Sequence, residues 1–88
     1  MKVSFHATIR EVAGVSETSI DADSLETLLF ALREKFGEKL YGMIVQNERL
    51  RDDVVILVNG QNIAHEEGIK TRLEPKDDVA IFPPVSGG

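Results

Sequence analysis

Residues 23–37, DSLETLLFALREKFG, constrain the fold most strongly, because they carry the period of one amphipathic helix. Apolar side chains recur there every three or four positions and form one face: Leu25, Leu28, Leu29, Leu32 and Phe36. Asp23 is placed to cap the N-terminus with Glu26 as its capping-box partner. Gly37 is placed to end the helix in the left-handed conformation. A helix with a single apolar face must pack that face against another layer of structure.

The segment before this helix has the period of a strand. Residues 2–10, KVSFHATIR, alternate apolar and polar side chains, which is typical of a half-buried strand. One side of this strand would carry Val3, Phe5, Ala7 and Ile9, and the other would carry Lys2, Ser4, His6, Thr8 and Arg10. Residues 11–18 contain Gly14 and predict a loop or hairpin turn. Residues 18–22 predict a short second strand carrying Ile20.

The segment after the helix predicts three further strands. Residues 54–60, VVILVNG, read as a strand that ends in an Asn-Gly turn. Residues 61–63 would form the short return strand. Residues 78–82, DVAIF, predict the last strand, and Pro83 ends it because proline has no N–H to donate to a sheet.

Two connecting segments carry weaker patterns. Residues 38–53 predict a helical turn around Leu40 followed by an irregular connection. Residues 64–78 are mostly polar and predict a loop with room for one helical turn. The element order is therefore strand, strand, helix, strand, short strand, strand. This order predicts an α+β domain in which one main helix packs on one face of a mixed sheet of four to five strands.

Composition narrows the functional classes. A chain of 88 residues makes one domain, and its 42% hydrophobic and 28% charged residues are ordinary for a folded protein. It has no cysteine, which excludes disulfides and thiolate metal sites and fits a cytoplasmic protein. The net charge of −5 argues against nucleic acid as a partner. We expect no membrane association, because no apolar run approaches a membrane span and residues 1–10 do not resemble a signal peptide.

The interior of the sequence offers no convincing catalytic constellation. His6 and His65 are far apart and belong to no recognisable metal-ligand spacing. The acidic pairs 52–53 and 77–78 flank strand starts and read as solvated turn residues. The glycines between residues 14 and 68 are isolated, so they do not form a phosphate-binding loop. We therefore expect a protein that is not an enzyme by itself, has no metal site and holds no cofactor stably.

The last eight residues, IFPPVSGG, are unlike an ordinary polar terminus. The predicted strand anchors Ile81 and Phe82, and the two prolines favour an extended path away from the body. We expect a folded domain over residues 1–84 and a flexible Gly-Gly tail over residues 85–88. Glycine has no Cβ, so the final pair could thread a narrow channel and offer an unhindered carbonyl carbon.

These segments together resemble the β-grasp sulfur carriers. The resemblance is greatest to the small, MoaD-type subunit of molybdopterin synthase. It covers nearly the whole chain, including KVSFHATIREVAG, DSLETLLFALREKFG, VVILVNGQNI and DDVAIFPPVSGG. The PPVSGG ending matches that subunit better than the ThiS-type carrier of thiazole synthesis. The resemblance implies a ubiquitin-like fold, in agreement with the element order.

The resemblance also implies a mechanism. A MoeB-type activating enzyme, related to the ubiquitin activators, would use ATP to adenylate the Gly88 carboxylate. A sulfur donor would convert the acyl-adenylate to a thiocarboxylate. The MoaE-type large subunit would then accept the sulfur to build molybdopterin. The residues expected to bind these partners are Gly87, Ser86, Val85, Pro84, Pro83, Phe82 and His6.

Three alternatives compete with the molybdopterin role. The chain could be a ubiquitin-like modifier joined to lysines of target proteins. It could instead carry sulfur for transfer-RNA thiolation or thiazole synthesis. A third alternative, from a different class, is a β-grasp interaction domain with an inert tail.

Overall fold

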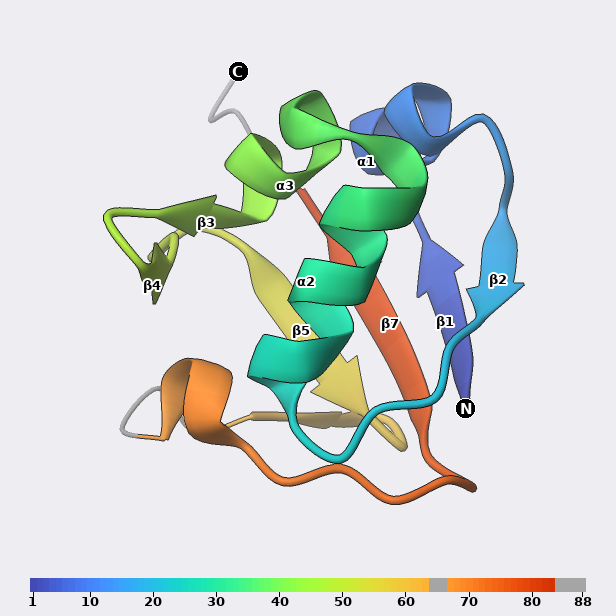
Figure 1. The fold of residues 1–88 in the computed structure, drawn as a ribbon, viewed down its shortest axis with the longest axis vertical. Coiled ribbons are helices and arrows are strands. Elements are labelled where there is room, and N and C mark those ends of the chain that lie inside the picture. The colour runs from blue at the N-terminus through green and yellow to red at the C-terminus, as the bar shows by residue number, and fades with distance from the viewer. Residues whose placement is uncertain (64–66, 84–88) are drawn as a thin grey trace.

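The computed structural model describes residues 1–63 and 67–83, and Figure 1 shows their arrangement. The elements are β1 (Lys2–Phe5), α1 (Ala7–Ala13), β2 (Glu17–Ser19), α2 (Leu25–Phe36), α3 (Glu38–Ile44), β3 (Val45–Gln46), β4 (Arg49–Leu50), β5 (Val55–Val58), β6 (Gln61–Asn62), the 3₁₀ helix η1 (Gly68–Lys70) and β7 (Asp78–Phe82). None of the helices within the described ranges is both long and apolar enough to cross a membrane.

The main sheet has five strands in the order β2-β1-β7-β5-β6. The two central strands, β1 and β7, come from opposite ends of the sequence and pair in parallel, with Phe5 opposite Ile81. The other neighbours pair antiparallel, so the sheet is mixed. Helix α2 lies across this sheet (Figure 1), which confirms the predicted α+β architecture.

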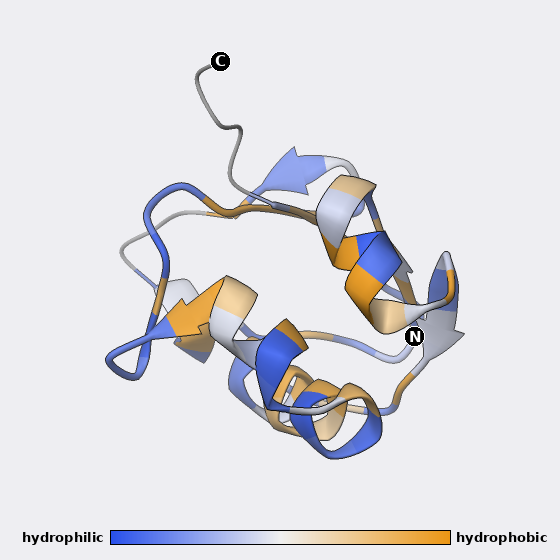
Figure 2. Ribbon diagram, turned by 90° about the horizontal axis from the view of Figure 1, so that it is seen from above, coloured by the Kyte–Doolittle hydropathy of each residue, from blue (hydrophilic) through white to orange (hydrophobic). Residues whose placement is uncertain are grey.

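Alternation along the central strands defines the core. Val3 and Phe5 of β1 and Val79 and Ile81 of β7 are buried on the face that α2 covers. The predicted apolar face of α2 packs on them, and Leu25, Leu28, Leu29 and Leu32 are all buried. Seen from above, the sheet and α2 form two separate layers with the core between them (Figure 2).

Helix α2 is confirmed, but the predicted cap is wrong. Ser24, not Asp23, directly precedes the first helical residue with extended φ, and its Oγ accepts a hydrogen bond from the Thr27 N–H at 3.2 Å. Glu26 does not complete a capping box with Asp23, since its carboxylate lies 3.3 Å from Lys70 Nζ. Gly37 ends the helix at positive φ as predicted, although its ψ of 175° is not that of the left-handed helix.

The first strand is shorter than predicted. It stops at Phe5, and the chain then forms helix α1, so the expected strand over residues 6–10 and loop over residues 11–14 are wrong. Ile9 is buried as predicted, but it reaches the core from a helix. Ile9, Val12 and Ala13 have the three- and four-residue spacing of a helix, and Gly14 ends it at φ 80°.

Residues 38–53 are more ordered than predicted. The helical turn expected around Leu40 extends into α3, where Leu40 and Ile44 are buried one turn apart. The expected irregular connection is instead a β3–β4 hairpin, which turns at Asn47 and Glu48 with φ of 55° and 62°. The turn that the sequence predicts at Asn59-Gly60, between β5 and β6, is confirmed.

Asp77 is not the solvated turn residue that the sequence predicts. Its side chain is buried and accepts hydrogen bonds of 2.8 Å from the Glu74 backbone N–H and from Asn59 Nδ2. The bond from the Glu74 N–H, followed by that from Asn59, lowers the pKa of the Asp77 carboxyl. Asn59 also accepts from the Asp78 N–H at 2.9 Å. The carboxylate therefore ties the β5–β6 turn to the loop before β7.

We predict that Asp77→Ala lowers the melting temperature at neutral pH, because two donors lose their acceptor. A lowered folded-state pKa stabilises the fold above the ordinary aspartate value of about 3.9. This contribution is lost as the pH falls from there through the folded-state pKa. Thermal melts from pH 2 to pH 7 should therefore converge for the two proteins at the acid end. The exposed neighbour offers the control Asp78→Ala, and an equal loss in that variant would contradict the assignment.

Candidate functional site

The structure describes three of the predicted site residues. His6, Phe82 and Pro83 lie within the described ranges. His6 and Phe82 are half-buried, whereas Pro83 is buried and leaves little surface for the predicted contact with a partner. The remaining predicted residues lie outside them: Pro84, Val85, Ser86, Gly87 and Gly88. The predicted boundary at residue 84 and the expected flexibility of residues 85–88 lie outside the described residues as well. The candidate site is therefore built from the end of β7 and its neighbours.

Strand β7 anchors this site at the centre of the sheet. It has β1 on one side and β5 on the other, with Ile81 facing Phe5 and Ile56 in the two registers. Ile81 is fully buried. The backbone just before Phe82 is therefore fixed by strand pairing on both sides and by the burial of Ile81.

His6 and Phe82 meet at the end of the two central strands. Their rings stack with centroids 4.2 Å apart and planes within 10°. The parallel register brings them together, and the His6 N–H donates to the Ile81 carbonyl oxygen at 3.2 Å. The two residues therefore lie together on the open face of the sheet. Phe82 points away from the core side occupied by Ile81.

The His6 ring has a second contact on the same face. Ser4 Oγ lies 3.2 Å from His6 Nε2, and it also donates to the Val79 carbonyl oxygen at 3.5 Å. Beyond His6, Ala7 has a φ of 52°, a conformation that non-glycine residues rarely adopt. This backbone turn starts α1 directly after the stack. Sequence reasoning missed Ser4 and Ala7, because neither contact nor turn has a local sequence signal.

The stack borders a larger apolar surface. The register places Val55 of β5 opposite Phe82 and Leu57 opposite Ala80, on the face away from α2. These four side chains are half-buried, as is His6. We call Val55, Leu57, Ala80, Phe82 and His6 the open-face patch. The alternation in VVILV and DVAIF could have predicted its three other apolar members once the strand pairing was known.

The described part of this site consists of one imidazole ring, one phenyl ring and aliphatic side chains. Within residues 1–63 and 67–83, no cluster of three or more histidine, cysteine, aspartate or glutamate side chains could hold a metal ion. The patch presents aromatic and aliphatic surface next to a fixed strand end. Such surfaces dominate the energetics of protein–protein binding.

The chain is similar to several known proteins over nearly its whole length. The ThiS family matches residues 3–88. Small archaeal modifier protein 3 of Haloferax volcanii is 33% identical over 90 residues, which span 100% of this chain and 98% of that protein. The solution structure of small archaeal modifier protein 1 from Methanosarcina acetivorans has a TM-score of 0.81 and 34% identity, covering 99% of this chain and 94% of that one.

A third similar protein carries a different name. A Pyrococcus furiosus protein, provisionally named molybdopterin converting factor subunit 1, has a TM-score of 0.71 and 28% identity, covering 96% of this chain and 95% of that one. Together these similarities confirm the predicted ubiquitin-like β-grasp fold.

The burial pattern predicts different costs for neighbouring truncations. Phe82→Ala should lower the free energy of unfolding by roughly 1–2 kcal/mol, because a half-buried ring is removed and its stacking contact with His6 is lost. Ile81→Ala should cost about 2–5 kcal/mol, because it leaves a cavity in the core. Urea denaturation of both variants measures the difference. Equal losses would show that Phe82 is a core residue.

Proposed function

Because this chain belongs to the ThiS family of ubiquitin-like sulfur carriers, we propose that its reactive group is the carboxylate of Gly88. The observation that carries the proposal is the position of β7. This central strand ends at the open-face patch, a few residues before the Gly-Gly pair. A partner that binds the patch could therefore reach the last residues of the sequence.

The sequence of residues 79–88 supports this proposal. These ten residues contain no charged side chain, so no neighbouring carboxylate or ammonium group competes with the Gly88 carboxylate for a partner's active site. Four extended residues span about 13–14 Å. Residues 85–88 are thus long enough to enter a channel while β7 stays in the sheet.

The proposed chemistry has two steps. A carboxylate oxygen of Gly88 attacks the α-phosphorus of ATP in the activating enzyme, and pyrophosphate leaves. A hydrosulfide ion released by the donor then attacks the carbonyl carbon, AMP leaves with the C–O bond electrons, and the S–H proton is lost to a base of the activating enzyme. The product is a thiocarboxylate on Gly88. The activating enzyme and the sulfur donor supply the acid, base and nucleophile for these steps.

We propose that the open-face patch docks the activating enzyme. His6 and Phe82 offer a flat, preformed aromatic surface next to Pro83, and Val55 and Leu57 extend it with aliphatic area. Because the two rings already stack in the free protein, little side-chain entropy is lost on binding. Pro83 and Pro84 would then direct the tail away from the domain.

Two fates of the activated carboxyl are supported by different relatives. Conjugation to lysines is favoured by the two small archaeal modifier proteins, at 33% and 34% identity. Sulfur transfer to a pterin precursor, with a MoaE-type large subunit as partner, is favoured by the Pyrococcus furiosus protein. Both fates share the adenylation step, so one carrier could serve both.

Mass spectrometry distinguishes these fates. The purified protein would be incubated with a MoeB-type activating enzyme, ATP and sulfide, and its intact mass measured. Sulfur carriage predicts a gain equal to the replacement of one oxygen by sulfur. Conjugation predicts that the peptide after Lys76 appears on lysine side chains of target proteins digested with trypsin. If neither a thiocarboxylate nor a lysine conjugate forms, the inert-tail alternative is favoured.

We predict that Gly88→Ala slows adenylation severely, because the added methyl group crowds the reacting carbonyl. One residue added after Gly88 should abolish the reaction at Gly88, since its carboxylate becomes a peptide carbonyl and can no longer attack ATP. Neither change should alter the melting temperature. Pyrophosphate release measures the first step. An extended protein that reacts at the normal rate would refute the assignment of Gly88.

Docking through the patch gives a separate prediction. Phe82→Ala should weaken binding to the activating enzyme by roughly 1–3 kcal/mol, the range of a hot-spot truncation. Val15→Ala is the matched control, because Val15 is 43% exposed and lies outside the patch. Isothermal titration with folded proteins measures both. Unchanged affinity in Phe82→Ala would rule out the patch as the docking site.

A further inference from the structure

A second aromatic surface lies on the helical side of the molecule. Phe30 of α2 is 47% exposed, and Val15 is the other large hydrophobic residue this exposed in the described part of the chain. The Phe30 ring stacks on Tyr41 of α3 with centroids 6.1 Å apart. Single exposed apolar residues are common and need no explanation. Phe30 differs from such isolated residues because it lines a hollow in the surface.

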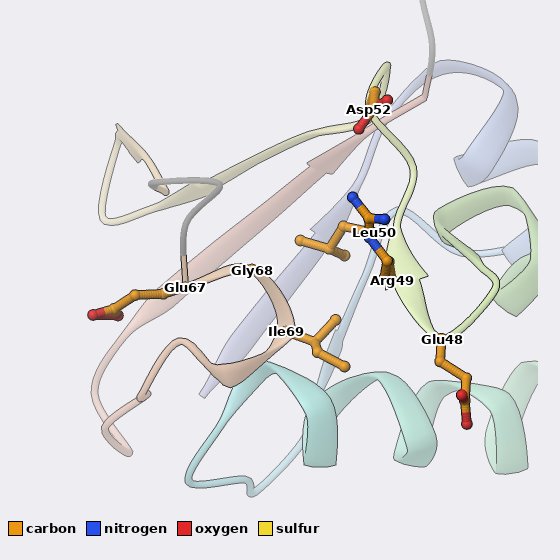
Figure 3. A pocket seen from close by; sticks show the side chains of 7 residues that line it. All are labelled: Glu48, Arg49, Leu50, Asp52, Glu67, Gly68 and Ile69. Carbon is orange, nitrogen blue, oxygen red and sulfur yellow. The ribbon is translucent and has the colours of Figure 1, made fainter.

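A hollow opens beside the Phe30 ring. It encloses about 250 Å³ between α2, α3, the β3–β4 hairpin and η1. Leu29, Val45 and Ile69 supply apolar walls, and Glu26 and Glu48 supply carboxylates. An adjoining hollow of about 210 Å³, seen in Figure 3, shares Glu48 and Ile69 with it. The surface is therefore a groove with an aromatic side, aliphatic walls and acidic groups.

Charge sets the kind of ligand this groove can accept. Its lining carries four carboxylates, on Glu26, Glu48, Asp52 and Glu67, against the two guanidinium groups of Arg33 and Arg49. The Glu26 carboxylate is already paired with Lys70 Nζ at 3.3 Å, so the remaining negative charge comes from the other three. The whole chain has a net charge of −5. An anionic partner would be repelled, and a cationic one attracted.

The protein already holds one arginine in this way. The guanidinium carbon of Arg33 lies 5.2 Å from the centroid of the Tyr41 ring, and its Nε donates to Glu38 Oε1 at 2.6 Å. An aromatic face and a carboxylate thus bind one guanidinium group together. Phe30 and Glu48, which line the same hollow, offer a second pair of these groups.

We propose that this groove binds an arginine side chain carried by a segment of a partner protein. The Phe30 face would take the guanidinium group by a cation–π contact. The Glu48 carboxylate, which extends from the hairpin turn toward α2 (Figure 3), would accept its hydrogen bonds. Leu29 and Ile69 would cover the aliphatic stem.

This groove and the open-face patch lie on opposite sides of the sheet. Helix α2 covers the face that buries Val79 and Ile81, whereas Phe82 points to the other face. A partner in the groove would leave the patch and the end of β7 free. The proposal therefore does not depend on the function proposed for Gly88.

NMR titration of the ¹⁵N-labelled full chain tests the proposal. The probe is a blocked hexapeptide of alternating arginine and leucine, and the matched probe has citrulline, its uncharged isostere, in place of arginine. We expect saturable shifts at the amides of Phe30, Glu48 and Ile69 with the arginine peptide. Citrulline should weaken binding by about tenfold, because both the cation–π and the charged hydrogen bonds are lost.

Variants separate the groove from general acidity. Phe30→Ala and Glu48→Gln should each weaken binding by roughly fivefold. Glu34→Gln, an equal loss of charge at an exposed site on the same helix, and Phe82→Ala should leave it within about twofold. Three results would overturn the proposal: shifts centred on His6 and Phe82, equal effects of Glu34→Gln and Glu48→Gln, or no saturable shift. Phe30 and Glu48 are both exposed, so both variants should fold, and their spectra report it directly.

Discussion

The parallel pairing of β1 with β7 is the interaction on which the rest of the structure depends. It joins residues 2–5 to residues 78–81 across almost the whole chain, so closing it costs considerable loop entropy. The pairing aligns Val3 and Phe5 with Val79 and Ile81 to form the face that α2 covers. The same register brings His6 to Phe82. Stability and recognition thus arise from one ladder of hydrogen bonds.

The two faces of the sheet differ in what they bury. Its inner face buries aliphatic side chains against α2 and α3 and contributes most of the apolar burial. Its outer face keeps half-buried apolar groups that a partner can cover. Under the function proposed for Gly88, the activating enzyme and the sulfur donor supply the reactive groups, and the carrier supplies a strand held firmly in the sheet. The groove lined by Phe30 and Glu48 lies on the helical side, away from the open-face patch.

Local patterns predicted the elements whose partners lie close in sequence. Helix α2 and the Asn59-Gly60 turn follow from periodicity and turn chemistry alone. The prediction of a strand over residues 6–10 was wrong because Ile9 fits the apolar period of both a strand and a helix. The change of backbone direction at Ala7 has no marker in the sequence. The β3–β4 turn lacks glycine, so its left-handed residues, Asn47 and Glu48, gave a weak signal. Asp77 needs Asn59, which only the tertiary fold brings near. The His6–Phe82 contact depends on the parallel register of β1 and β7, which joins the two ends of the sequence and leaves no local signal.

The central position of the last strand also governs when the protein becomes competent during synthesis. A nascent chain lacking residues 78–82 has no strand between β1 and β5, so the two halves of its sheet cannot join. Contacts this distant in sequence form late and slow folding. Ribosomal products that stop before residue 78 therefore lack both the complete sheet and the final glycines. The open-face patch is therefore completed only when the last strand has been synthesised and has paired between β1 and β5.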